Sequence, residues 1–238
     1  MKSIETKIVD HQLFSSLNEQ QKIILEYSIE IGYLLPRKYL FKNDKRLKHI
    51  YFIKQGKLLV GKNLGLRNES ISFLGMKPMF IGLESLMLPA NNKFVKTLSH
   101  VHYARIDAKL FLQLLMESNG FHNVVRKQIA ERLNEMDDKY VRRHSNVKLL
   151  DRLKFFFAEI LEKNKGRSRD ENRIEIHITH FEIGQYLQCS RQSVSHFMSN
   201  IRKEGIIDYD RNWIRINDLQ KLLKWEIDER SFFSSEIA

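Results

Sequence analysis

A run of polar side chains between Arg191 and Ser199 is suited to forming several hydrogen bonds from one surface. Arg191 and Gln192 each carry paired hydrogen-bonding atoms, and His196 adds ring nitrogens. At 100° per residue, Gln192, His196 and Ser199 fall on one face of a helix. The opposite face is apolar and carries Val194, Phe197, Met198 and Ile201. Side chains of these polar types pair with base edges in the major groove and with phosphate oxygens.

The residues before this face predict how it is positioned. Thr179 is placed to cap a first short helix, and Glu182 three residues later completes a capping box. We expect a turn at Gln188–Cys189 and a second helix capped by Ser190. The pattern therefore predicts two helices around a tight turn, with an ordinary surface helix pair as the alternative.

The segment after the second helix predicts a β-hairpin. Two β-rich runs, 206–209 and 213–216, flank the polar turn residues 210–212. Helix, helix and hairpin is the order of a winged helix-turn-helix, and Arg211 in the turn is suited to contact a phosphate. We interpret Trp213 as a core anchor of the wing rather than a residue that stacks on a base.

The motif EIGQYLQCSRQSVS, residues 182–195, resembles the helix-turn-helix of the Crp/Fnr transcription regulators. The resemblance places Arg191 on the family's DNA-contacting arginine, and it places Gln192 and His196 where a base-reading Glu and Arg usually stand. Gln can pair with adenine whereas Glu accepts from cytosine, so we do not expect the usual half-site. Gln188 replaces a common turn glycine. The predicted DNA-binding residues are Arg191, Gln192, Ser193, Ser195, His196, Ser199, Thr179, His180 and Arg211.

Upstream, the chain is β-rich from Gly32 to Ile106. The pattern alone predicts a β-sandwich or barrel. Its hydrophobic runs on either side of Gly56 resemble the family's cyclic-nucleotide-binding-type β-roll, which implies a jelly roll. We therefore expect an α+β fold with an N-terminal jelly-roll (double-stranded β-helix) sensor domain, a long dimerisation helix and a C-terminal winged helix-turn-helix.

The effector pocket implied by the resemblance departs from that of cyclic-AMP-binding members. Leu83 follows Gly82 where those members carry a ribose-binding Glu, and Glu84 comes one place late. Asn91–Asn92–Lys93 stands where they carry an Arg-Ser pair, and Met136–Asp137 replaces their adenine-binding Thr-Ser. Lys93 or Lys96 could replace the arginine, depending on which points inward. We expect that cyclic AMP is not the effector, whose identity stays unknown.

The residue types in the chain limit which metal, cofactor and catalytic sites it can form. With one cysteine, Cys189, the chain cannot build a four-thiolate iron–sulfur cluster, and we interpret this thiol as a small apolar residue. His100 and His102 have strand spacing, which we interpret as solvent-facing rather than as a metal or haem site. The sequence carries no glycine-rich phosphate loop, nucleophile elbow or metalloprotease motif. We therefore expect no enzyme activity, no metal and no cofactor.

A helix expected from about Phe121 to His144 carries apolar residues at alternating spacings of four and three, which is a heptad seam. These residues are Ile129, Leu133, Met136 and Tyr140. The resemblance implies that the seam forms a dimer interface, and packing on the chain's own β-roll is the alternative. The expected domains are residues 1–117 (sensor), 118–145 (dimerisation helix and hinge) and 146–238 (DNA binding).

Charge and composition favour a polyanionic partner. The 238 residues include 40 Lys plus Arg against 29 Asp plus Glu, a net charge of +11. No secretory or membrane-spanning run is evident, so a cytoplasmic protein without membrane partners is expected. We predict a homodimeric regulator that binds a palindromic site on double-stranded DNA, with RNA polymerase as a further partner. The competing functions are a ligand-binding signalling module without DNA binding and an RNA-binding protein.

Overall fold

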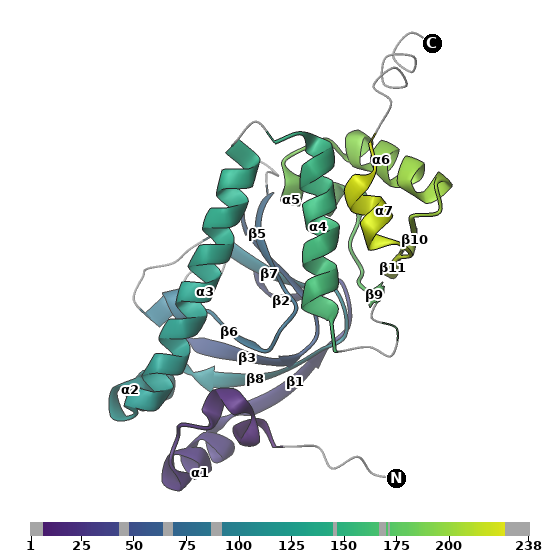
Figure 1. Cartoon of the computed structure of the whole chain (residues 1–238). Coiled ribbons are helices and arrows are strands. Elements are labelled where there is room, and N and C mark those ends of the chain that lie inside the picture. Colours follow the sequence, from purple (N-terminus) through teal and green to yellow (C-terminus); the bar gives the residue numbers. More distant parts are fainter. Residues whose placement is uncertain are drawn as a thin grey trace, which may run out of the picture. The chain divides into compact units, whose positions relative to one another are not determined.

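The computed structural model describes residues 7–42, 48–63, 69–86, 92–144, 147–166, 170 and 172–226 (Figure 1). The chain divides into two compact units, Met1–Val141 and Arg142–Ala238. Within the described ranges, no helix is both long enough and apolar enough to cross a membrane.

Unit 1 begins with short helices that the sequence reading did not anticipate. Two 3₁₀ turns, η1 (Ile8–Asp10) and η2 (Gln12–Phe14), precede α1 (Glu19–Ser28). Asn18 and Gln21 form a reciprocal capping box at the start of α1, in which the Asn18 side chain accepts from the Gln21 amide at 2.9 Å.

Eight strands then form two antiparallel four-stranded sheets. The strands are β1 (Glu30–Leu34), β2 (Tyr39–Lys42), β3 (His49–Gln55), β4 (Leu58–Asn63), β5 (Glu69–Gly75), β6 (Met79–Ile81), β7 (Lys93–Thr97) and β8 (Val101–Asp107). One sheet has the order β1-β8-β3-β6 and the other β2-β7-β4-β5. A further 3₁₀ turn, η3 (Leu83–Leu86), follows β6. The predicted β-rich fold of the N-terminal domain is confirmed, although "double-stranded β-helix" describes these sheets loosely.

The turn between β3 and β4 depends on Gly56. Its φ is +116°, and a Cβ at this position would lie 2.5 Å from the His100 carbonyl oxygen. Only glycine fits this backbone without strain, so the predicted pair of strands around Gly56 has a clear steric basis.

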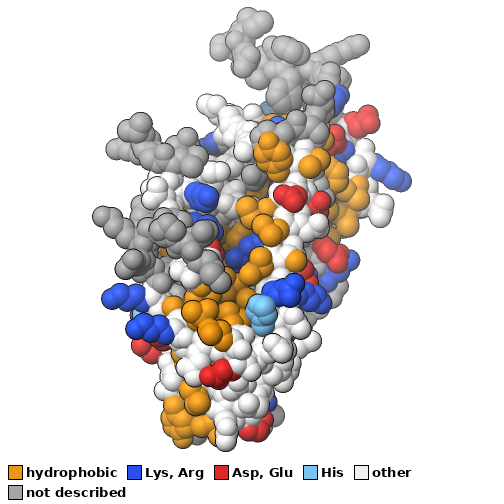
Figure 2. Space-filling model, turned by 90° about the vertical axis from the view of Figure 1, so that its left-hand side faces the viewer, with side chains coloured by type: hydrophobic (Ala, Val, Ile, Leu, Met, Phe, Trp, Pro, Cys, Tyr) orange, Lys and Arg blue, Asp and Glu red, His pale blue; other side chains and the backbone are white. Residues whose placement is uncertain are grey.

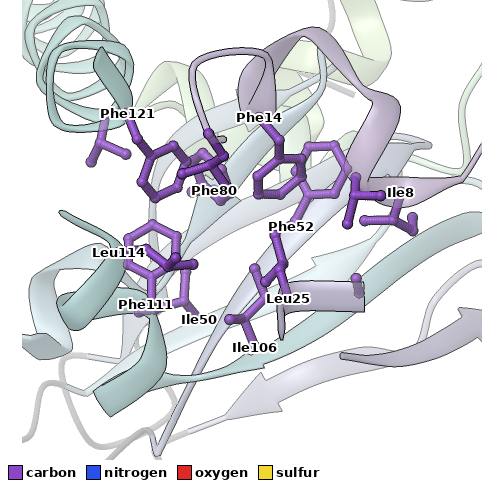
Figure 3. Packing of buried hydrophobic residues seen from close by; sticks show 14 of the residues in the cluster. Ile8, Phe14, Leu25, Ile50, Phe52, Phe80, Ile106, Phe111, Leu114 and Phe121 are labelled. Carbon is purple, nitrogen blue, oxygen red and sulfur yellow. The ribbon is translucent and has the colours of Figure 1, made fainter. Parts of the chain in front are cut away.

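Two hydrophobic cores hold unit 1 together. One lies between the sheets and combines Tyr51 and Ile53 of β3 with Phe73 of β5 and Val95 of β7. The other lies on the outer side of the first sheet, beneath the N-terminal helices (Figure 3). Its centre is an aromatic cluster with neighbouring ring centroids 4.9–5.9 Å apart, formed by Phe14, Phe52, Phe80, Phe111 and Phe121.

Two helices follow the sheets. α2 (Ala108–Glu117) is capped by Asp107 as predicted, with its carboxylate accepting from the Lys109 amide at 2.8 Å. α3 (Asn119–His144) follows after the single non-helical residue Ser118. Phe121 and Val125 near the start of α3 are buried in the outer core, which anchors the helix to the sheet.

Unit 2 contains the predicted winged helix-turn-helix elements in the predicted order. They are α4 (Leu149–Asn164), β9 (Arg173–Glu175), α5 (His180–Leu187), α6 (Arg191–Lys203), β10 (Ile207–Asp210), β11 (Trp213–Ile216) and α7 (Leu219–Lys224). The three strands form an antiparallel sheet of order β10-β11-β9. The core of unit 2 combines Phe156 and Phe157 of α4 with Ile183 of α5 and Met198 of α6, all of which are buried.

Candidate nucleic-acid interface

The two helices of the helix-turn-helix are fixed by side-chain caps at their starts. The Thr179 hydroxyl accepts from the Glu182 amide at 3.2 Å, and the Glu182 carboxylate accepts from the Thr179 amide at 2.9 Å. Ser190 caps α6 by accepting from the Ser193 amide at 3.0 Å. These bonds satisfy amides that a helix start leaves open, so the predicted caps are confirmed and both helix ends are defined.

The turn between the helices is tight, although glycine is absent from its left-handed position. Gln188 adopts φ 56° and ψ 53°, and its amide donates to the Gly184 carbonyl. A Cβ on Gly184 would lie 2.8 Å from the Cys189 carbonyl oxygen, so only glycine allows α5 to approach the turn this closely. Replacement of the usual turn glycine by Gln188 therefore leaves the left-handed turn in place.

Arg152 of α4 stabilises the same turn through a hydrogen bond. Its Nη1 donates to the Leu187 carbonyl at 2.8 Å, at the end of α5 where carbonyls lack helical partners. Burial raises the pKa of the half-buried Cys189 thiol, and the Arg152 charge opposes that shift. Cys189 is partly exposed, so it is less buried than a small apolar core residue would be. Its raised pKa disfavours the reactive thiolate.

α6 presents its polar residues outward, as the periodicity predicts. Val194, Phe197, Met198 and Ile201 are buried. Arg191 and Gln192 at its first two positions are exposed, whereas Ser193, Ser195, His196 and Ser199 are partly buried. The N-terminal end of α6 therefore carries the two side chains most able to reach a partner.

Several predicted DNA-binding residues contact one another or neighbouring polar residues. The hydroxyls of Ser190 and Ser193 lie 2.9 Å apart, and Asn200 Nδ2 lies 3.0 Å from His196 Nε2. His180 Nδ1 lies 2.8 Å from Ser195 Oγ, which joins the first residue of α5 to the middle of α6. The sequence reading missed Asn200, although its position four residues after His196 is the spacing of helical neighbours.

His180 is half-buried beside cationic and aromatic side chains. Burial, and then the positive charge of Arg191, lower the pKa of His180 below its ordinary value. Its ring meets that of Tyr209 edge-on at 5.5 Å between centroids. Arg202 lies 5.0 Å above the Tyr209 ring and pairs with Asp208 at 2.9 Å. Tyr209 and Arg202, which the sequence reading also missed, thus join β10 to α6.

The hairpin has the predicted strands, with Arg211 exposed in the turn between them. Trp213 is only partly buried, because Ile214 and Ile216 fill the core positions of β11. The guanidinium of Arg173 on β9 lies 4.6 Å from the centre of the Trp213 ring. Trp213 therefore forms a cation–π contact at the sheet surface instead of the core anchor that we expected.

The region of the expected effector pocket holds an internal ion pair. Glu84 Oε1 lies 2.7 Å from Lys93 Nζ. Lys93 shares a strand face with Val95 of the inter-sheet core, whereas Lys96 faces the other way. Burial alone would raise the pKa of Glu84, but the hydrogen bond and charge of Lys93, together with a backbone hydrogen bond and the charge of Arg132, hold that pKa below its ordinary value. Asn91, which we expected near the pocket, lies outside the described residues.

α3 also reaches this region through two side chains that the sequence reading missed. Arg132 Nη2 donates to the Phe80 carbonyl at 2.8 Å, and its guanidinium lies 4.7 Å from the centre of the Phe73 ring. Gln128, one turn earlier, accepts from the Phe80 amide at 3.0 Å. Gln128 and Arg132, four residues apart on α3, therefore bind the amide and the carbonyl of Phe80 in β6.

A neighbouring face of α3 carries large apolar side chains that are exposed. Its exposed side chains include Ile129, Leu133, Met136 and Tyr140, the four residues of the predicted seam. Leu133 is 57% exposed and Tyr140 63%. Figure 2 shows hydrophobic side chains gathered in a band on the face of the molecule that α3 crosses. Packing on the β-roll of its own unit therefore leaves the seam 39–63% exposed, and the dimer interface stays a prediction.

One of the two histidines considered as metal ligands packs against an aromatic ring. The ring of His102 stacks on Tyr33 at 4.2 Å between centroids. Throughout the part of the chain that the structure describes, no three His, Cys, Asp or Glu residues gather as a metal site.

Comparisons with known proteins agree with the geometry. Residues 147–225 match the model of the Crp-like helix-turn-helix domain, which spans α4 to α7. The anaerobic regulatory protein of Pasteurella multocida is 22% identical over 213 residues, covering 88% of this chain and 77% of that protein. The anaerobic regulatory protein of Haemophilus influenzae is also 22% identical, covering 88% of this chain and 81% of its own length.

Solved structures show the same fold over most of the chain. FixK2 from Bradyrhizobium japonicum aligns with a TM-score of 0.71 at 14% identity, covering 84% of this chain and 98% of that one. TTHB099, a CRP-family transcriptional regulator from Thermus thermophilus, gives a TM-score of 0.68 at 14% identity, covering 81% and 95%. Residues 147–225 thus form a Crp-like helix-turn-helix DNA-binding domain, and the chain as a whole is similar to the Crp/Fnr transcription regulators in sequence and fold.

Proposed function

We propose that this regulator binds a palindromic DNA site as a homodimer, with α6 of each copy in the major groove. The observation that carries the proposal is the exposure of Arg191 and Gln192 at the capped start of α6. An Arg there is suited to guanine or phosphate, and a Gln to adenine. Ser193, Ser195, His196 and Ser199 extend the surface along α6, and Thr179, His180 and Arg211 are proposed to contact the flanking backbone.

The dimer is proposed to form through the exposed seam of α3. Leu133 and Tyr140 are large apolar residues that a second copy would remove from water. A two-fold dimer presents two copies of α6, which is why a palindrome is expected. In this proposal residues 1–117 act as a sensor or scaffold, 118–145 as dimerisation helix and hinge, and 146–238 bind DNA. RNA polymerase is the further partner proposed, and a cytoplasmic location stays a prediction.

Selection of duplexes from a random pool tests this function. The parent protein should enrich a palindrome whose half-sites lie about one helical turn, roughly 10 base pairs, apart. Gln192 and His196 should change the bases preferred within each half-site from those of the usual family site. A ligand-binding module without DNA binding would enrich no sequence. Enrichment of a single-stranded RNA pool instead would favour the RNA-binding alternative.

A further inference from the structure

Ser195 is the residue of the α6 surface whose hydrogen-bonding role is set by another helix. A serine hydroxyl can donate one hydrogen bond and accept two, so by itself it discriminates poorly between bases that offer donors and bases that offer acceptors. Here the Ser195 hydroxyl lies 2.8 Å from His180 Nδ1, within hydrogen-bonding distance. Whichever atom donates in that bond, the remaining capacity of the hydroxyl is restricted.

The surroundings of His180 fix both its position and its charge. The edge of its ring meets Tyr209 of β10, and Tyr209 is held in turn beneath Arg202 of α6. Burial and the neighbouring Arg191 favour the neutral imidazole. A neutral imidazole carries one donor nitrogen and one acceptor nitrogen, so the role of Nε2 decides the role of Nδ1.

The second nitrogen of His180 is available to a partner. Among the residues that the structure describes, Nε2 of His180 makes no hydrogen bond, and His180 lies at the N-terminus of α5. If DNA lies against the start of α5, as proposed above, this nitrogen would donate to a phosphate oxygen. With the proton on Nε2, Nδ1 is an acceptor, and it takes the hydroxyl proton of Ser195.

We propose that His180 is a specificity-determining residue that acts through Ser195, by engaging the serine proton and leaving its oxygen as an acceptor toward DNA. The base that meets Ser195 is then one with an exposed amino group, adenine or cytosine, rather than one with a carbonyl oxygen. This inference rests on the proposed DNA binding. It adds a base preference that neither Ser195 nor His180 would produce alone.

Variants of both residues test the inference on the enriched duplex. His180→Phe keeps an aromatic ring beside Tyr209 but removes Nδ1, and Ser195→Ala removes the hydroxyl. Each variant is titrated against the enriched duplex and against duplexes with every single base-pair change in one half-site. Both should lower discrimination at the same base pair by about 2- to 10-fold, the value of one hydrogen bond. The double variant should lose no more discrimination than either single variant, because the two residues act as one unit.

Two controls separate this role from a structural one. Ser195→Thr keeps the hydroxyl and should keep the base preference. Thermal melts of all variants report folding, and a purely structural role would weaken every duplex by the same factor without changing the ratio between them. Unchanged discrimination in either single variant, or discrimination lost at different base pairs, overturns the inference. Failure of the parent protein to enrich any duplex would instead refute the proposed function, so the two failures are distinguishable.

Discussion

Two histidines, His11 and His180, lie in surroundings that favour their neutral form. His11 caps the start of the 3₁₀ turn η2, where its Nδ1 accepts from the Leu13 amide at 3.2 Å. Its ring lies 5.0 Å from that of Phe52 in the outer core. Burial, and then the charge of Lys54, lower the pKa of His11 below the ordinary 6.5. The folded state therefore binds fewer protons here than the unfolded chain.

This difference predicts acid destabilisation of unit 1. Because the folded pKa of His11 lies below the unfolded one, its contribution to stability is complete above the ordinary 6.5 and decreases as pH falls below it. His11→Asn offers a side-chain oxygen to the Leu13 amide and does not titrate. Urea unfolding at pH 7.5 and 5.5 should show a larger loss of unfolding free energy in the parent than in this variant. Equal losses in the two proteins would contradict the prediction.

At the scale of single elements, α3 has two faces with different tasks. Arg132 and Gln128 attach the helix to Phe80 of its own unit, while Ile129 and Leu133 point to solvent. The seam is a continuous exposed apolar patch, whereas the apolar residues on an ordinary protein surface are scattered singly. These hydrogen bonds hold α3 against its own unit. The exposed seam can then contact a second copy of the chain.

Leu133→Lys is predicted to weaken the dimer without unfolding the monomer. Burying one leucine stabilises by about 1.5–3 kcal/mol, and a two-fold interface loses it twice, about 3–6 kcal/mol, so the dimer dissociation constant should rise by at least roughly 100-fold. Analytical ultracentrifugation across a concentration series measures this constant. Tyr27→Lys is the matched control, since Tyr27 is 88% exposed on α1 and lies outside the seam. A monomeric parent, or a Leu133→Lys dimer as tight as the control, would contradict the prediction.

The sequence predicted elements best where a local rule determines the backbone. The caps at Thr179, Ser190 and Asp107 and the turn at Gly56 were predicted, because capping and glycine conformations are decided within a few residues. Helix α1 was missed although Asn18 and Gln21 carry its capping signal. Contacts between distant segments could not be predicted. His180 with Ser195 and Arg132 with Phe80 depend on how helices pack, which no local spacing encodes.

Within the whole molecule, the region of the expected effector pocket contains charged side chains that pair with each other. Glu84 and Lys93, which could have replaced missing nucleotide ligands, are paired with each other. A ligand that used either residue would have to break this ion pair. The expectation that cyclic AMP is not the effector therefore acquires a structural reason.

A thermal-shift titration tests this expectation. A ligand present at about 1,000 times its dissociation constant stabilises the folded state by about 4 kcal/mol, which is several degrees in melting temperature. Millimolar cyclic AMP should leave the melting temperature unchanged. A dose-dependent rise that Glu84→Ala abolishes and Glu84→Gln retains in part would show that the glutamate binds the nucleotide after all.

Binding of DNA by the exposed start of α6 should be visible in the salt dependence of the affinity. Affinity for the enriched duplex is measured over a series of salt concentrations for the parent, Arg191→Ala and Lys109→Ala. Lys109 is exposed on α2, so its variant removes the same charge from the other unit. Arg191→Ala should cost about 1–3 kcal/mol, roughly 5- to 150-fold in affinity, while Lys109→Ala should match the parent. Arg191→Ala binding as tightly as Lys109→Ala at every salt concentration would contradict the claim.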